Sequence, residues 1–91
     1  MSNYRQSTAD ELGIKPKITK GEQMGWIDPT GKEIPLWRPD ENANHRDMVW
    51  EWLRKQKGGY VYVAEIVQNY INGYSLFTAT EKAWEEYTNN K

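Results

Sequence analysis

The feature that most restricts the fold of this chain is its reliance on aromatic side chains. The 91 residues include five Trp, six Tyr and one Phe, but no cysteine and only 37% hydrophobic residues. Each buried aromatic removes a large area from water, so a few of them can replace scarce Leu and Ile in a core. A chain of this length buries roughly 60–65% of its unfolded surface. The sequence therefore predicts one small folded domain with a thin aromatic core, because disordered chains are poor in these residues.

The charges are nearly balanced. Twelve basic residues face thirteen acidic ones, for a net charge of −1, with no acidic tail or basic arm. This balance argues against a dedicated nucleic-acid binder and against an acidic decoy of phosphate groups. The lack of cysteine excludes disulfides and thiolate catalysis and fits a reducing compartment. No apolar run suits a membrane span or a signal peptide, so we expect a cytoplasmic protein without a membrane partner.

The sequence of the first 38 residues predicts an arm followed by a hairpin. Residues 1–20 are polar, and we expect a partly ordered arm there, before a single α+β domain over residues 21–91. Residues 22–38 resemble a hairpin around Asp28-Pro29-Thr30-Gly31, which has the residue order of a type I turn. Pro35 cannot donate to a strand ladder, so the second strand should be irregular or lie at an edge.

Two helices follow from hydrophobic periodicity. A helix over about residues 45–57 starts near Asn44, stops at Gly58-Gly59 and places one set of side chains on a common face. A second helix over about residues 78–88 starts at the capping box Thr78-Ala79-Thr80-Glu81. The expected buried faces are His45, Met48, Val49, Trp52, Leu53 and Gln56 in the first helix, and Ala79, Ala83, Trp84 and Tyr87 in the second.

The segment 60–77 leaves two folds open. Tyr60-Val61-Tyr62-Val63 has the composition of a strand, and Asn72-Gly73 is typical of a hairpin turn. However, apolar residues between positions 63 and 71 also recur at helical spacing. The favoured fold is an α+β domain with an antiparallel sheet packed by two helices. The alternative is a winged-helix-like, mainly α domain with a helix over 63–72.

No catalytic, metal-binding or cofactor-binding pattern is present. The single histidine, His45, has no cysteine and no paired acid nearby in the sequence, and the glycines form no phosphate loop. We therefore expect no enzyme and no cofactor. Trp, Tyr and Arg are enriched at the centres of binding interfaces. The candidate partner-binding residues are Trp50 and Arg54 first, from their position off the apolar helix face, and then Trp37, Arg38, Tyr60, Tyr62 and Tyr74.

Short motifs resemble the small phage "ABA sandwich" family. They are Met24-Gly25-Trp26, then Trp37-Arg38-Pro39-Asp40-Glu41-Asn42 before a helix, and Ala79-Thr80-Glu81-Lys82-Ala83 in the last helix. The likeness spans roughly residues 20–88, and Val63 to Ile71 departs from it because the family has a strand there. The resemblance implies a phage origin and an α+β sandwich, and it supplies no catalytic residues.

A second resemblance is to the core of a winged-helix DNA-binding domain. It rests on the helix 45–57, a helix beginning Val63-Ala64-Glu65-Ile66, and the final helix. That last helix carries Glu81, Glu85 and Glu86 with only Lys82, which is a poor composition for reading DNA.

From these observations we expect a non-enzymatic, phage-encoded accessory protein in the host cytoplasm. It would bind a protein partner, such as a host defence or replication protein, and inhibit it. The alternatives are a winged-helix transcriptional regulator that binds DNA and a sponge for a small ligand such as a nucleotide. Nucleic acid is the less favoured partner, and a homo-oligomer remains open.

Overall fold

The computed structural model describes residues 3–90 and places a helix at the start of the chain. Helix α1 spans Tyr4–Leu12; Asn3 caps it by accepting a hydrogen bond from the backbone N–H of Gln6. Tyr4, Thr8 and Ala9 on this helix are buried. The expectation of a partly ordered arm over residues 1–20 is therefore wrong for its described part, because α1 contributes side chains to the core. Residues 1 and 2 lie outside the described residues.

Three antiparallel strands follow, in the order β1-β2-β3, and we call them the β-ribbon. Strand β1 (Lys15–Thr19) pairs with β2 (Glu22–Ile27), and β2 pairs over two positions with β3 (Glu33–Ile34). The turn predicted at residues 28–31 joins β2 to β3. Its Asp28 carboxylate accepts hydrogen bonds from the backbone N–H groups of Thr30 and Lys32, both at 2.9 Å. Strand β3 stops before Pro35, as its missing N–H requires.

Helix α2 spans Ala43–Lys55 and confirms the predicted buried face. Val49 and Leu53 are fully buried, the other four positions of that face are half-buried, and Glu51, Arg54 and Lys55 away from it are exposed. The boundaries differ by two residues at each end from the expected 45–57. The cap is Asn42 rather than Asn44, since the Asn42 carboxamide oxygen accepts from the N–H groups of Asn44 and His45.

The ambiguous segment is a helix. Helix α3 spans Gly59–Ile71, and within residues 3–90 no strand follows residue 34. The turn from α2 into α3 is so tight that a Cβ on Gly59 would lie 1.9 Å from the carbonyl oxygen of Leu53. Only glycine fits at this position, so Gly59 allows α3 to start directly beside the end of α2.

Helix α4 spans Leu76–Asn89, and its cap is Ser75, three residues before the expected start. Ala79, Ala83 and Trp84 are buried, as predicted. The Trp84 indole N–H donates to the Ser7 hydroxyl at 2.9 Å, which joins the last helix to the first. The core is made by Tyr4, Ala9, Ile14, Ile34, Trp37, Val49, Leu53, Ile66, Ala79, Ala83 and Trp84.

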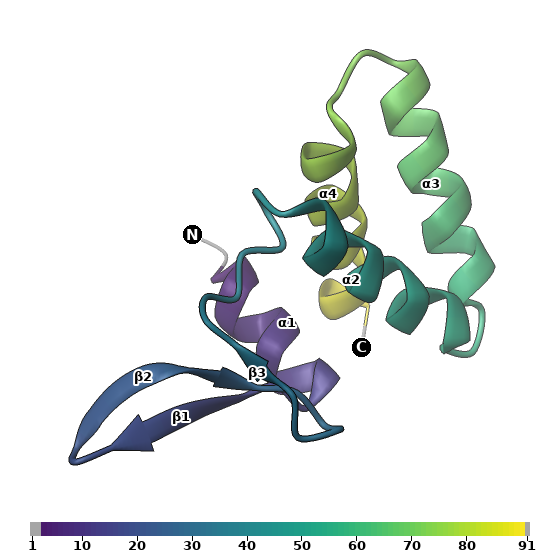
Figure 1. Cartoon of the computed structure of the whole chain (residues 1–91). Helices are drawn as coiled ribbons and strands as arrows, with labels where there is room; N and C mark the ends of the chain where they lie inside the picture. Colours follow the sequence, from purple (N-terminus) through teal and green to yellow (C-terminus); the bar gives the residue numbers. More distant parts are fainter. Residues whose placement is uncertain (1–2, 91) are drawn as a thin grey trace.

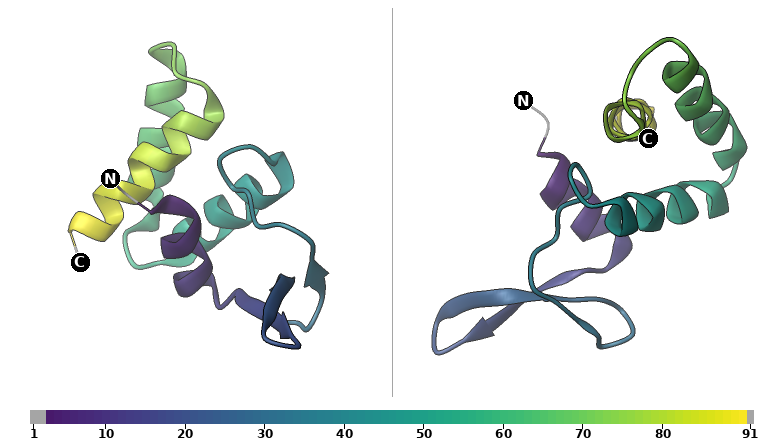
Figure 2. Two further views of the ribbon diagram at one scale, coloured as in Figure 1. Left: turned by 90° about the vertical axis from the view of Figure 1, so that its left-hand side faces the viewer. Right: turned by 45° about the horizontal axis from the view of Figure 1, so that its top comes forward.

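The α+β class is confirmed, with the helices gathered together and the β-ribbon extending away from them (Figure 1). Helices α2, α3 and α4 pack on one another, and α1 contacts α2 and α4. Both the first view and the right-hand view of Figure 2 show the β-ribbon and α3 at opposite ends of the molecule. The overall dimensions are 45 × 26 × 24 Å, so the long axis separates two surfaces that face different directions. No helix within residues 3–90 is long and apolar enough to cross a bilayer.

Candidate protein-binding surface

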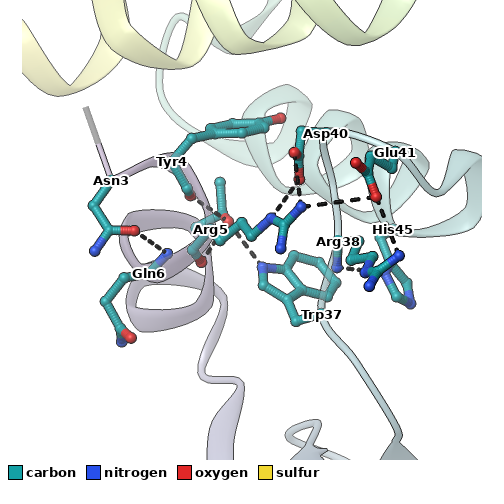
Figure 3. A network of polar contacts seen from close by, with 10 residues as sticks. Asn3, Tyr4, Arg5, Gln6, Trp37, Arg38, Asp40, Glu41 and His45 are labelled. Atoms are coloured by element: carbon teal, nitrogen blue, oxygen red, sulfur yellow. Dashed lines mark hydrogen bonds and ion pairs between the residues drawn. The ribbon is translucent and has the colours of Figure 1, made fainter. Parts of the chain in front are cut away.

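A polar network attaches the base of the β-ribbon to α1 and α2 (Figure 3). The Arg5 guanidinium donates two hydrogen bonds to the Asp40 carboxylate, at 2.8 and 3.0 Å. The hydrogen bonds from Arg5 lower the pKa of Asp40 below its ordinary value. A two-point contact of this kind fixes orientation as well as distance. The segment that leaves β3 is therefore held at a defined angle to the helices.

Trp37 belongs to this network and not to a free surface. Its side chain is 1% exposed, and the indole N–H donates to the Thr8 hydroxyl at 2.9 Å. The ring stacks on His45 with centroids 4.8 Å apart. His45 accepts the backbone N–H of Arg38 through Nδ1, and burial lowers the pKa of its imidazole. Both rings therefore act as structural supports of the loop between β3 and α2.

Trp50 and Tyr62 also pack within the protein. The Trp50 indole N–H donates to the Thr80 hydroxyl at 2.7 Å, and the ring lies against the core. Helix phase placed Trp50 away from the apolar face of α2, but α4 covers that side of the helix. Tyr62 makes an edge-to-face contact with Tyr87 at 5.5 Å. The sequence could not predict these two contacts, because both depend on where α4 docks.

The remaining predicted residues are exposed but scattered. Arg54 pairs with Glu51 at 2.7 Å, and Arg38 pairs with Glu41 at 3.2 Å. Tyr60 lies at the start of α3. Tyr74 follows the end of α3, where the Lys82 ammonium lies 4.8 Å from the centre of its ring. The structure therefore does not bring Trp50, Arg54, Trp37, Arg38, Tyr60, Tyr62 and Tyr74 together into one site.

An apolar hollow lies instead on the β-ribbon. It has a volume of about 490 Å³ and is lined by Gln23, Met24, Gly25, Trp26, Pro35 and Leu36. Met24 is 62% exposed and Leu36 is 43% exposed, and both line the same hollow, so they form an adjoining apolar surface that a partner could cover. We call this surface the ribbon hollow. The Met24-Gly25-Trp26 motif and the segment around Pro35 form it jointly.

Gly25 is needed for this surface to exist. Its φ is +139°, which L side chains rarely adopt, and an added Cβ would lie 3.2 Å from the carbonyl oxygen of Ile34. Met24 has no partner in the ladder, because Lys17 pairs with Gly25 and Ile18 pairs with Gln23. It is therefore the extra residue of a β-bulge, and bulges change the direction of side chains next to functional sites.

The edge of β2 beside the hollow is open. Strand β3 pairs only with Trp26 and Ile27, and the backbone of Pro35 lies beside Gly25. Within residues 3–90 no strand therefore pairs with β2 from Glu22 to Met24 on that side. Unpaired backbone groups on an edge strand can pair with an extended segment of another chain. The apolar hollow next to this edge could then hold side chains of that segment.

Sequence reasoning missed Met24 and Leu36 as surface residues. Both lie within the hairpin predicted over residues 22–38, where regular alternation would bury every second residue. The signal that could have identified them is the combination of Gly25 and Pro35, because both residues interrupt regular pairing.

The structure shows no grouping of three or more His, Asp or Glu side chains suited to a metal ion in the described part of the chain. Comparisons with protein-family models, with curated proteins and with solved structures found no match to this chain.

Proposed function

We propose that this chain is a non-enzymatic binding protein that captures an extended segment of a protein partner at the ribbon hollow. The observation that supports this proposal is the position of exposed Met24 and Leu36 along the unpaired edge of β2. Strand addition would satisfy the open backbone groups, and the hollow would select apolar side chains at alternate positions of the partner. The nearly balanced charge of the chain supports a protein partner over DNA.

The biological setting of the proposal comes from the resemblance to the phage family. On that basis the protein is a phage-encoded accessory factor, and the partner is a host defence or replication protein that it inhibits. The two hydrogen bonds from Arg5 to Asp40 join α1 to the loop that leaves the β-ribbon. This contact supports binding, since a surface held in place loses less freedom when a partner binds.

The test is affinity capture from a bacterial lysate treated with nuclease, using the native sequence, Met24→Glu and Leu36→Glu. We expect a protein that remains bound after nuclease treatment and whose capture falls at least about tenfold in both variants. The matched control is Tyr74→Glu, which adds the same charge at an exposed aromatic outside the ribbon hollow. Capture that both ribbon variants retain would contradict the proposed site, and capture that nuclease abolishes would favour a nucleic-acid partner.

A further inference from the structure

The largest group of exposed apolar side chains lies on α3. This helix is at the end of the molecule opposite the β-ribbon (Figure 2). Residues 58–80 contain a single charged side chain, Glu65, although 27% of the whole chain is charged. The Glu65 side chain lies on the side of α3 that faces α4 and not on the outer side, because it shares a hydrogen bond with Glu86 of α4. The outer side of α3 is therefore free of charge and mainly apolar, with Gln68 as an exposed polar side chain beside Ala64.

One row of residues runs along the centre of this side. Tyr60, Ala64, Val67 and Ile71 fall within about 60° of one another at 100° per residue. All four are exposed, Tyr60 at 75% and Ile71 at 69%. We call this row the α3 seam. Val61 and Tyr70 flank it and are more than half exposed, so the apolar surface is wider than the seam itself.

The α3 seam is complementary to itself. Its residues are separated by four, three and four positions, so the spacing is the same when read in either direction. If a second α3 lies antiparallel, Tyr60 is level with Ile71 of the other copy and Ala64 is level with Val67. The Tyr60 ring of each copy then contacts Ile71 of the other copy at the two ends. The small Ala64 allows the two helices to approach closely at the centre. Antiparallel helix dipoles also attract one another.

The area involved is sufficient for a dimer. The exposed parts of the seam and its flanks amount to roughly 500 Å² of apolar surface per copy, or about 1,000 Å² when two copies meet. That total is near the lower limit for a specific interface, so the association should be reversible. A membrane surface fits this helix less well, because interfacial helices carry several Lys or Arg side chains beside the apolar face.

We propose that the protein forms a two-fold symmetric homodimer through antiparallel contact of the α3 seams. The contact leaves both ribbon hollows exposed at the far ends, since the β-ribbon that forms each hollow lies at the opposite end of its own copy from α3 (Figure 1). A dimer therefore presents two partner sites, and avidity would strengthen binding to a partner that is itself oligomeric. This proposal does not depend on what the ribbon hollow binds.

The first test is sedimentation equilibrium of the full chain from about 10 µM to 1 mM, a range that covers weak reversible association. We expect a monomer–dimer equilibrium in the native sequence. Val67→Glu and Tyr60→Glu each place a carboxylate in the seam and should weaken dimerisation at least about tenfold. Tyr60→Glu guards against misfolding, because an acidic residue at a helix start is favourable. Circular dichroism confirms that each variant is folded.

The matched control is Ile18→Glu, at an exposed apolar residue of β1 remote from α3, and we expect it to dimerise normally. A native chain that is monomeric throughout this range would overturn the proposal. So would a dimer that both seam variants leave intact. If the chain is monomeric but still captures a partner from the lysate, the dimer proposal is wrong and the proposed function is unaffected.

The second test measures the orientation of the two helices. The chain has no cysteine, so Tyr60→Cys and Ile71→Cys each introduce a unique thiol. When the two variants are mixed and oxidised, antiparallel contact predicts that the mixed disulfide predominates, since two copies of position 60 would lie about 16 Å apart along the axis. Predominant disulfides between identical variants would indicate parallel helices and overturn the antiparallel assignment.

Discussion

Replacing Trp37 with alanine removes the largest fully buried side chain at the junction of α1, the β-ribbon and α2. The substitution eliminates the hydrogen bond to Thr8 and the stacking contact with His45. It also leaves a cavity at the junction, because no other side chain fills the space of the fully buried indole.

The expected loss follows from these contacts. Large-to-small changes at a buried Trp cost about 3–5 kcal/mol. The buried Thr8 hydroxyl loses one of its partners but still donates to the backbone carbonyl of Tyr4, so only a small further penalty arises. A chain of 91 residues has a total stability of roughly 5–14 kcal/mol, so the loss takes away between about a fifth of it and all of it. The melting temperature should fall by at least about 12 °C.

Urea denaturation followed by Trp fluorescence and circular dichroism would measure the loss, with calorimetry to check two-state behaviour. Tyr60→Ala is the control, because Tyr60 is 75% exposed in the single chain and should change monomer stability by less than about 0.5 kcal/mol. If Trp37→Ala melts within two or three degrees of the native protein, Trp37 is not a structural support, and its assignment as a partner-binding residue would have to be restored.

Three further predictions concern the helices. Gly59→Ala should destabilise strongly, by several kcal/mol in urea titrations, because the added methyl overlaps a carbonyl of α2; an unchanged midpoint would contradict the tight turn. Trp50→Phe removes the hydrogen bond to Thr80 and should cost about 1–2 kcal/mol in the same assay, while a change below about 0.3 kcal/mol would indicate a free surface residue. The hydrogen bond with Glu86 raises the pKa of Glu65 from 4.5 to about 7, so protonation of Glu65 favours the folded state. This contribution is complete below pH 4.5 and is lost as the pH rises to about 7, so Glu65→Gln should gain stability relative to the native protein in melts at pH 8 but not at pH 4.

The local elements were largely readable from the sequence. The buried face of α2 follows from periodicity alone, since residues three and four apart share one side of a helix whatever lies beyond it. The turn at residues 28–31 follows from the preferences of Asp, Pro and Gly for particular backbone angles. The break between α2 and α3 before Gly58-Gly59 is a similar local effect, although α2 ends two residues earlier than expected. These features depend on neighbours within a few positions.

The identity of α3 could not be read in this way. Its sequence has the β-branched and aromatic residues of a strand together with the spacing of a helix, and local preferences differ by too little to decide. Packing of Ile66 against α2 and α4 stabilises the helix. Helix α1 was missed because its own apolar pattern is weak. It is ordered by contacts far along the chain, such as Ser7 with Trp84.

Which side chains lie on the surface was also decided by tertiary structure, because it depends on contacts between residues that are distant in the sequence. Whether an aromatic side chain is core or surface depends on what covers it, and that partner is often distant in sequence: Thr80 covers Trp50, and Thr8 contacts Trp37. Composition shows only that there are more aromatics than a minimal core requires. The docking of α4 and α1 decides which of them are buried, and it leaves the α3 seam and the ribbon hollow exposed to water.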